Sequence, residues 1–370
     1  MRNKVIALVS NNIANDQRLI KVGNTLQRHG YEFLLIGTAH RGLPQLDHIS
    51  FPTQRLPIRF QKNFLFYAEL QFRHLLHLVQ KNKKDAIILA NDLDTLLPAK
   101  IISNLYKIPL VVDFHEIFSE MPTLIEGTIQ KNTWKWLEKQ LLPSLKHTYT
   151  ISESYADFFR NNYKIQPEVI MNVPLLGSVK SSSSAHNYSE KIILYQGAMN
   201  YSRGIDKMIL AMKHLENTVL WLIGNGPCLA EFQALSQAEN LQKKVIFLGL
   251  KSPEELKKIS PLADLGLSLE EDKGLSYRFA LPNKIFDYLH AEIPVLGSSD
   301  LIEVKKIIEN YQVGDVIVHH HPEHIALKIS KLLKKDKSEF SVGLQKAKLE
   351  FNWEKQEEKL LNIYHNAAHE

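Results

Sequence analysis

The sequence contains little cysteine and no long hydrophobic run, and each absence excludes a class of protein. Its single cysteine, Cys228, leaves no partner for an internal disulfide and no cluster of thiolates for a metal. No apolar segment approaches the length that crosses a bilayer, and the short run from Val5 to Val9 indicates a buried first strand rather than a signal peptide. We therefore expect a cytoplasmic protein, which could lie at the inner face of the membrane.

A compact basic stripe with a recognition motif is also missing, so nucleic acid is not an expected partner. The net charge of +5 is nevertheless spread unevenly. Residues 1–180 contain 22 Lys and Arg against 15 Asp and Glu, whereas the remainder contains 23 against 25. The basic first half favours an anionic partner, such as a phospholipid surface or a lipid-phosphate acceptor, although ordinary scatter of charge explains it equally well.

A chain of 370 residues with 44% hydrophobic and 23% charged residues is typical of a globular protein with two domains. Its first half alternates apolar strands with amphipathic helices. Val5–Val9 and Phe33–Ile36 are predicted strands, and between them Asp16 caps a predicted helix that Gly30 ends. This alternation predicts a doubly wound parallel sheet.

A later strand of that predicted sheet, Leu110–Asp113, is followed directly by ionisable residues. It delivers Asp113, His115 and Glu116 at its carboxyl end, where open α/β sheets bind their ligands. A histidine between two carboxylates is oriented and charged by them. The alternative is a surface histidine in a polar loop.

Two patterns invite a metal interpretation. Asp92 and Asp94 could hold Mg²⁺ or Mn²⁺ against a diphosphate. They directly precede the helical run 96–105, however, where aspartates cap a helix and complement its dipole. The His-rich tract His319–His321 falls in the loop before the predicted helix Glu323–Leu333. We therefore predict no metal site.

The segment Arg55–Leu78 mixes basic and aromatic residues on a predicted helix. Such a helix can lie on a membrane interface. A core-facing helix with a solvated basic side has the same composition, and both interpretations stay open.

The second half begins after a serine-rich segment, Ser178–Ser189, whose composition predicts a linker. The strand Ile192–Tyr195 follows, and Gly197 and Arg203 come after it. A glycine lets the backbone approach a ligand, and an arginine can bind a diphosphate with two parallel hydrogen bonds.

Pro282 marks the start of a helix whose apolar face contains Leu281, Ile285, Tyr288 and Leu289. Lys284 lies in the first turn, where the helix dipole favours negative charge. An anion bound at this end would remove the conflict. The alternative is a solvated lysine on a surface helix.

Two strings of the sequence resemble those of a known family. The run LPNKIFDYLHAEIPVLGSS at 281–299 resembles the nucleotide-sugar-binding helix of family 4-like (group 1) retaining glycosyltransferases of the GT-B fold, and VVDFHEIFSE at 111–120 is similar to a string that recurs in them. Asp287 matches the second of that family's two glutamates. Phe279 replaces the first glutamate, and Glu292 replaces a glycine.

The resemblance implies an α/β chain of the GT-B fold, with two Rossmann-like doubly wound parallel-sheet domains and an interdomain cleft. It places an acceptor-side domain at residues 1–177, a linker at 178–190 and a nucleotide-sugar-binding domain at 191–345. Residues 346–370 are then a C-terminal helix that returns to the first domain.

The resemblance also assigns roles to individual positions. The catalytic candidates are His115, Glu116, Arg203 and Lys284. The donor-binding candidates are Gly197, Arg203, Gly249, Leu250, Asn283, Lys284 and Asp287. In these roles Arg203 and Lys284 stabilise the departing diphosphate. Asp287 accepts hydrogen bonds from the ribose hydroxyls, and His115 orients the sugar. The loop after the first strand, with Asn11 and Asn12, is expected to approach donor and acceptor.

The implied function is metal-independent, retaining hexosyl transfer from a nucleotide-diphosphate sugar to a hydroxyl of a glycan or lipid-linked acceptor, as in polysaccharide biosynthesis. The nucleotide sugar is the donor substrate, no cofactor is expected, and an anionic membrane is an expected peripheral contact. Two alternatives stay open. One is a nucleotide-sugar epimerase of the same fold. The other is a non-catalytic nucleotide-sugar-binding partner subunit, because Phe279 and Ala198 replace a glutamate and an arginine that are common in the family.

Overall fold

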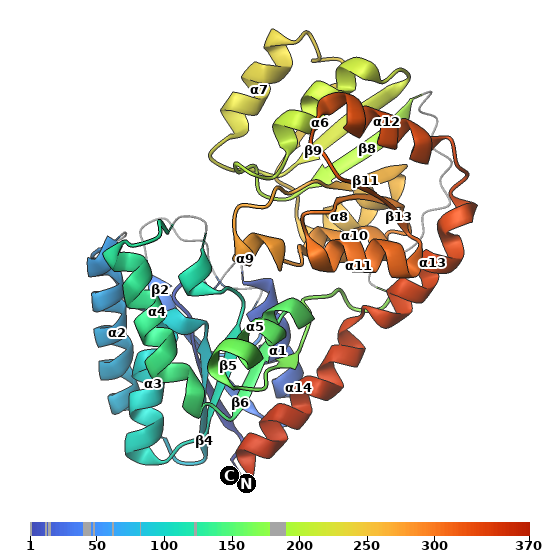
Figure 1. Cartoon of the computed structure of the whole chain (residues 1–370). Coiled ribbons are helices and arrows are strands. Elements are labelled where there is room, and N and C mark those ends of the chain that lie inside the picture. Colours follow the sequence, from blue (N-terminus) through green and yellow to red (C-terminus); the bar gives the residue numbers. More distant parts are fainter. Residues whose placement is uncertain are drawn as a thin grey trace. The chain divides into compact units, whose positions relative to one another are not determined.

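The computed structural model describes residues 2–11, 13, 16–39, 46, 49–60, 63–81, 83–121, 124–177 and 190–370. The chain forms two compact units, one of Met1–Met171 with Gln356–Glu370 and one of Asn172–Lys355 (Figure 1). Each unit contains one parallel sheet with helices, which confirms the predicted class of two Rossmann-like domains. The predicted linker at 178–190 lies outside the described residues except for Glu190, and Asn12 lies outside them too.

The sheet of the first unit has the strand order β3-β2-β1-β4-β5-β6-β7, and every pair is parallel. Its strands are β1 (Lys4–Leu8), β2 (Glu32–Ala39), β3 (Thr53–Pro57), β4 (Ala86–Asn91), β5 (Leu110–Phe114), β6 (His147–Thr150) and β7 (Glu168–Val169). All residues of β4 are buried, as expected for a strand whose two faces are both covered by helices. The chain reverses its direction across the sheet between β1 and β4, and sheets of this kind bind ligands at the carboxyl ends of the strands near that point.

Helices cover both faces of this sheet. They are α1 (Gln17–Arg28), α2 (Asn63–Gln80), α3 (Leu93–Tyr106), α4 (Ile129–Leu141), α5 (Glu153–Tyr163) and α14 (Trp353–Ala368), with 3-10 turns η2 (Phe118–Glu120) and η3 (Leu142–Ser144). In Figure 1, α2, α3 and α4 lie side by side on one face, and α1 and α14 lie on the other. The Asp16 side chain accepts the Leu19 N–H at 3.0 Å, which confirms the predicted cap of α1.

The predicted helix over Arg55–Leu78 is wrong in its first part. Residues Thr53–Pro57 form β3, which pairs with β2 at the edge of the sheet, and α2 begins only at Asn63. The strand has no alternation of buried and exposed side chains, because only Leu56 in it is buried. Its pairing with β2 therefore outweighs the local pattern.

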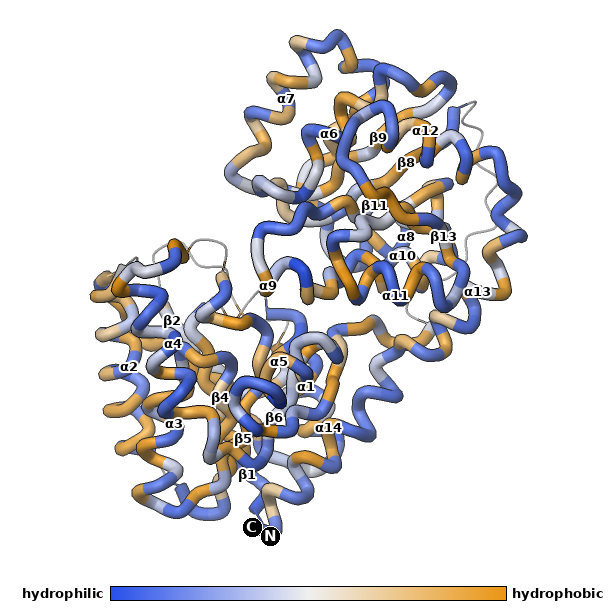
Figure 2. The backbone as a smooth tube through the Cα atoms, in the orientation of Figure 1, coloured by the Kyte–Doolittle hydropathy of each residue, from blue (hydrophilic) through white to orange (hydrophobic). Residues whose placement is uncertain are grey.

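The sheet of the second unit has the order β10-β9-β8-β11-β12-β13 and is also parallel. Its strands are β8 (Lys191–Gln196), β9 (Thr218–Ile223), β10 (Val245–Gly249), β11 (Leu265–Ser268), β12 (Val295–Ser298) and β13 (Gly314–Ile317). Its helices are α6 (Ile205–Ala211), α7 (Leu229–Ala238), α8 (Pro253–Ile259), α9 (Leu275–Arg278), α10 (Asn283–His290), α11 (Ile302–Tyr311), α12 (Pro322–Leu333) and α13 (Ser338–Glu350), with 3-10 turns η4 (Met212–His214) and η5 (Ser260–Leu262). Figure 2 shows hydrophobic residues along the central strand β11.

Helix α10 is fixed tightly against this sheet. The predicted apolar face is confirmed, because Leu281, Ile285, Tyr288 and Leu289 are all buried. The Tyr288 ring fills the space above Gly266 of β11, where an added Cβ would lie 2.5 Å from the ring. The Tyr288 hydroxyl also lies within hydrogen-bonding distance of backbone carbonyls in β8 and β11. These contacts hold the first turn of α10 in place relative to the carboxyl ends of both strands.

Candidate functional site

The first unit places a buried ion pair at the carboxyl end of β5. Arg18 of α1 donates from Nε and Nη2 to the two carboxylate oxygens of Asp113, each at 2.8 Å. Arg18 is 4% exposed and Asp113 is fully buried. A third donor, Nη1 of Arg18, bonds the carbonyl of Ile170 at 2.6 Å. This is a bidentate Arg–carboxylate contact, which is strong because two parallel charge-assisted hydrogen bonds form at once. It holds Asp113 as an anion.

His115 lies directly beyond this ion pair. Its Nε2 lies 2.7 Å from Oδ2 of Asp113, and its Nδ1 lies 3.7 Å from Oδ2 of Asp92. Burial lowers the pKa of His115, but Asp113 and then Asp92 outweigh this effect and raise the pKa to about 9. Burial likewise raises the pKa of Asp113, while Arg18 and His115 bring it down to about 2. At neutral pH, therefore, the predicted catalytic histidine is an oriented imidazolium.

Asp92 has a role that differs from the predicted helix cap. It occupies the position before α3, but its side chain makes no capping hydrogen bond there. Instead Oδ1 accepts the backbone N–H of His115 at 2.7 Å and that of Glu116 at 3.3 Å. The backbone of Asp92 has φ +67° and ψ 172°, a region in which a side chain is strained. Surrounding contacts thus hold this residue in place, and it ties the loop after β4 to the loop after β5.

Asp94 and Glu116 complete the acidic surroundings of this loop. Asp94 was predicted to precede the helix, but α3 already begins at Leu93, so Asp94 lies in its first turn and is buried. Burial raises its pKa to about 7, with Ser10 opposing and Glu116 reinforcing the shift. Burial also raises the pKa of Asp92, while the His115 imidazolium opposes it. Glu116 itself is exposed, at the edge of the group.

The second unit gathers three charged side chains at the carboxyl edge of its own sheet. Lys284 of α10 contacts Oε1 of Glu270 at 2.5 Å, and Nη1 of Arg203 lies 3.5 Å from the same oxygen. Glu270 is 1% exposed and Lys284 is 7% exposed. Burial raises the pKa of Glu270, but Lys284 and then Arg203 lower it below its usual value overall. The interpretation of Lys284 as a solvated lysine is wrong, and its counter-ion within the chain is Glu270.

Gly197 has no side chain, and the Lys284 side chain of this cluster lies in the space that a side chain would approach. Its φ is +142°, and an added Cβ would lie 3.4 Å from Cε of Lys284. The ammonium of Lys284 also lies 4.1 Å from the centre of the Tyr195 ring, at the end of β8. Arg203 stacks less closely, with its guanidinium 5.7 Å from the ring of Tyr277. The structure thus brings three predicted residues together, namely Gly197, Arg203 and Lys284.

Asp287 lies about one turn beyond Lys284 on α10 and is hydrogen-bonded to Gln196, the last residue of β8. Its Oδ2 accepts from Nε2 of Gln196 at 2.7 Å, and the side-chain oxygen Oε1 of Gln196 accepts from the Ser260 hydroxyl at 2.8 Å. Asn283, at the start of α10, is exposed. These hydrogen bonds orient the Asp287 carboxylate through neutral side chains, those of Gln196 and Ser260.

Gly249 and Leu250 lie at the end of β10, two strands away from β8. Gly249 has φ +69°, and its carbonyl accepts the Gly224 N–H at 3.0 Å. Leu250 is exposed. They share the carboxyl edge of the sheet with the charged cluster, but among the described residues neither forms a hydrogen bond with its side chains.

Other predicted features can be located as well. Among the described residues, no group of three or more His, Cys, Asp or Glu side chains is arranged to hold a metal ion. His319–His321 lie in the loop between β13 and α12, as predicted. In the part of the chain that the structure describes, no helix is both long and apolar enough to cross a membrane.

Sequence reasoning missed Arg18 and Glu270, although each leaves a signal. Arg18 shares the buried face of α1 with Val22 and Leu26, at spacings of four residues. A lone arginine on such a face needs a buried counter-ion. Glu270 directly follows the buried strand β11, as His115 follows β5. The identity of the partner, however, depends on how distant segments pack.

Comparisons with known proteins agree with this architecture. The sequence model of the family described as "Glycosyltransferase Family 4" matches residues 17–174, and that of "Glycosyl transferases group 1" matches residues 179–348. An uncharacterised glycosyltransferase of Methanocaldococcus jannaschii is 30% identical over 152 residues, which are 39% of this chain and 36% of that protein. The chain therefore spans about a third of the length of that relative.

Solved structures show the same fold along nearly the whole chain. A sucrose-phosphate synthase of Thermosynechococcus elongatus has a TM-score of 0.80 at 16% identity, covering 99% of both chains. Anabaena HepE in complex with UDP and glucose has a TM-score of 0.76 at 16% identity, covering 98% of this chain and 99% of that one. At this identity the likeness establishes the fold.

Proposed function

The chain belongs to the family 4-like, group 1 glycosyltransferases, and from this premise we propose that it moves a hexosyl group from a nucleotide-diphosphate sugar to a hydroxyl of a glycan or lipid-linked acceptor. The bond from the anomeric carbon to the diphosphate breaks, and a bond to the acceptor oxygen forms with retained configuration. The proton of the acceptor hydroxyl passes to the departing diphosphate. Neither a metal nor a cofactor takes part in this proposal.

One observation carries the proposal: the cations of Arg203 and Lys284 converge on a single oxygen of Glu270 beside Gly197. A transferase of this kind must stabilise negative charge on the leaving diphosphate, and preoriented cations do this without reorganising. The cluster holds two cations and one carboxylate, so it carries an excess positive charge that a diphosphate would neutralise.

The remaining residues receive roles from their places around this cluster. Asp287 accepts the ribose hydroxyls, and Gly249 and Leu250 support the base. Asn283 stands beside the diphosphate at the exposed start of α10. In the first unit, the His115 imidazolium donates to the sugar hydroxyls, with Glu116 beside it. The complex of HepE with UDP and glucose supports a nucleotide-sugar donor for this fold.

Exposed apolar side chains on α2 support an acceptor at a lipid surface. They are Phe64, Leu65, Phe72, Leu76 and Val79. Arg73, the single Lys or Arg of this helix, pairs with Glu69 of the same helix, so the exposed apolar stripe is the feature that suits α2 to a membrane interface. We therefore include lipid-linked saccharides among the acceptors and an anionic membrane as a peripheral contact.

The test is incubation of the protein with a panel of nucleotide-diphosphate sugars, with and without simple glycoside acceptors. Nucleoside diphosphate release and the anomeric configuration of the product are followed by NMR. We expect slow hydrolysis of one donor alone and faster transfer with retention when an acceptor is present. Interconversion of two sugars on the intact donor would identify an epimerase instead. Tight donor binding without turnover on any acceptor would identify a partner subunit.

A further inference from the structure

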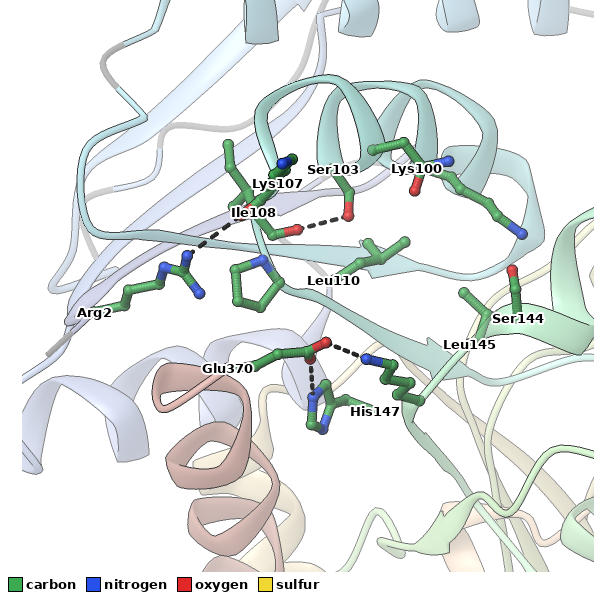
Figure 3. A pocket seen from close by; sticks show the side chains of 13 residues that line it. Arg2, Lys100, Ser103, Lys107, Ile108, Leu110, Ser144, Leu145, His147 and Glu370 are labelled. Atoms are coloured by element: carbon green, nitrogen blue, oxygen red, sulfur yellow. Dashed lines mark hydrogen bonds and ion pairs between the residues drawn. The ribbon is translucent and has the colours of Figure 1, made fainter.

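The first unit contains a hollow at the opposite edge of its sheet from His115. Strands β5 and β6 begin here, at Leu110 and His147, and Arg2 precedes β1. The hollow has a volume of about 380 Å³ and lies between the C-terminal half of α3, the start of β6 and the end of α14 (Figure 3). Because the carboxyl ends of the strands hold the His115 group, this hollow is a separate place on the molecule.

The charge around the hollow is strongly one-sided. Four cationic side chains line it, those of Arg2, Lys100, Lys107 and Lys146. Glu370 is the only acidic side chain among the described residues that do so. Like charges brought together at one concave surface repel each other and attract a multivalent anion. The hollow therefore concentrates part of the positive excess of the first half of the sequence.

Two of the cations are held by backbone contacts instead of carboxylates. Nη2 of Arg2 donates to the carbonyl of Lys107 at 3.3 Å, and the Lys100 ammonium donates to the carbonyl of Leu141. Burial lowers the pKa of Lys100. The ammonium of Lys107 makes no hydrogen bond or ion pair with any described residue. These positive groups are positioned without a neutralising partner.

A carboxylate of the chain itself occupies one side of the hollow. Oε1 of Glu370 bonds the Lys146 ammonium, and Oε2 lies 2.8 Å from Nε2 of His147 (Figure 3). Hydrogen bonds from Lys146 and then His147 lower the pKa of Glu370. Glu370 follows the last turn of α14 and is partly exposed. The structure thus shows that a carboxylate fits against Lys146 and His147 at one side of the hollow.

We propose that this hollow binds a phosphomonoester or diphosphate group, which replaces the Glu370 carboxylate on Lys146 and His147 and reaches Lys107 and Arg2. A phosphate carries more charge and more acceptor oxygens than a carboxylate, so it can satisfy several of these donors at once. The volume leaves room for further atoms of the ligand against the apolar wall at Ile108. The same chemistry occurs on soluble metabolites and on lipid headgroups.

The test is calorimetric titration of inorganic pyrophosphate into the full chain, in a buffer free of phosphate. The Arg203→Ala protein is used throughout, so that the cation cluster of the second unit, which keeps Lys284, binds more weakly and contributes equally to every protein compared. We expect binding that Lys107→Glu weakens by roughly tenfold to a hundredfold, the range for losing one charge-assisted contact. Glu370→Gln should instead tighten binding, because it removes the competing carboxylate.

Lys164→Glu is the matched control. Lys107 and Lys164 are both exposed, both end a helix in the left-handed region, with φ of 52° and 61°, and both bond a carbonyl four residues earlier. Only Lys107 lines the hollow. Equal pyrophosphate affinity in the two charge-reversed proteins would overturn the proposal, as would the absence of binding heat in the Glu370→Gln protein.

A second arm distinguishes the source of the phosphate group. The protein is sedimented with phosphatidylcholine vesicles that contain or lack phosphatidate, a lipid phosphomonoester. Phosphatidate-dependent sedimentation that Lys107→Glu abolishes and Lys164→Glu preserves would assign the hollow to lipid headgroups. Pyrophosphate binding with the same dependence on Lys107, but no such sedimentation, would assign it to soluble phosphates.

Discussion

The Asp92 carboxylate accepts the backbone N–H of His115 at 2.7 Å, and its second oxygen lies 3.7 Å from Nδ1 of the same histidine. One side chain thereby fixes both the backbone and the charge of the residue that follows the neighbouring strand. Asp113 completes the arrangement from the other side of the ring, at 2.7 Å from Nε2. The imidazolium thus lies between the carboxylates of Asp92 and Asp113. The backbone of Asp92 is strained, with φ +67°.

We expect Asp92→Asn to shift the pH profile of turnover. The pKa of His115 is raised to about 9, so the imidazolium persists through neutral pH and is lost as the pH rises through about 9. Asparagine still accepts the backbone N–H groups but no longer attracts the positive charge. The alkaline limb of kcat should therefore move to lower pH by roughly one unit or more, the usual effect of removing a neighbouring charge.

Asp92→Gly is the informative comparison, because glycine relieves the strained backbone but supplies no acceptor. It should lose both the charge effect and the fixed loop, so its kcat should fall below that of Asp92→Asn at every pH. An alkaline limb at the same pH in wild-type and Asp92→Asn proteins would show that Asp92 does not set the charge of His115.

His115→Ala should lower turnover far more than it weakens nucleoside diphosphate binding. The imidazolium belongs to a different unit from the Arg203 and Lys284 cluster, which is expected to hold the diphosphate. Contacts made only in the transition state depress kcat and kcat/KM together. Steady-state kinetics and calorimetry on the same preparation measure the two effects. Wild-type kcat in this variant would remove His115 from the mechanism.

We expect activity to survive chelation of metals by EDTA. Asp92, the first member of the Asp-x-Asp pair, is already bound to two backbone N–H groups, and Asp94 is buried with its pKa raised to about 7 by burial. A neutral or fully engaged carboxyl is a poor ligand for Mg²⁺ or Mn²⁺. Initial rates before and after dialysis against EDTA provide the measurement. Loss of activity that Mn²⁺ restores would contradict this prediction.

Much of the fold could be predicted from local sequence. Buried strands such as β4 are runs of apolar residues, and caps such as Asp16 use contacts within one turn. The edge strand β3 could not, because it has only one buried residue and is defined by its pairing with β2. The same holds for the boundary of α14, whose residues divide between the two units at Gln356.

The candidate site was predictable in its positions but not in its partners. Residues after strand ends, such as His115 and Gly197, follow from the geometry of parallel sheets. The contact of Asp92 with His115 joins segments 23 residues apart, and that of Glu270 with Lys284 joins segments 14 apart. Local patterns explained Asp92 as a cap and Lys284 as a lysine in need of an external anion. Packing of distant segments instead places Asp92 against the backbone of His115 and gives Lys284 an internal counter-ion, Glu270.

Glu270→Gln should tighten binding of a nucleoside diphosphate while lowering the stability of the ligand-free protein. The buried Lys284 and the partly exposed Arg203 would lose the carboxylate that they now share. Breaking such a buried pair costs about 3–5 kcal/mol, and the ligand would then be the only counter-ion. Thermal unfolding measures the stability of the ligand-free protein, and calorimetry measures the binding of the nucleoside diphosphate. Glu271→Gln makes the same chemical change at the next residue, whose partner is the exposed Lys273, and should change neither.

Arg203 and Lys284 should contribute jointly to diphosphate binding. Lys284→Met keeps an apolar chain beside Tyr195 and removes the charge, and Arg203→Ala removes the other cation. Each should weaken nucleoside diphosphate binding by roughly tenfold to a hundredfold, the range for one charge-assisted contact, and leave binding of the nucleoside unchanged.

The double variant tests whether the two cations act on one ligand. Both now lie within 3.5 Å of the same oxygen of Glu270, so their effects on a diphosphate at that place should not add. Lys273→Met is the control, because Lys273 is a neighbouring lysine that pairs with Glu271 and is half exposed. Calorimetric titration of nucleoside and nucleoside diphosphate into all four proteins separates the phosphate contacts from the base and ribose contacts. Unchanged diphosphate affinity in Lys284→Met would show that its ammonium serves only as the counter-ion of Glu270, and the proposed stabilisation of the leaving diphosphate would then lose its main support.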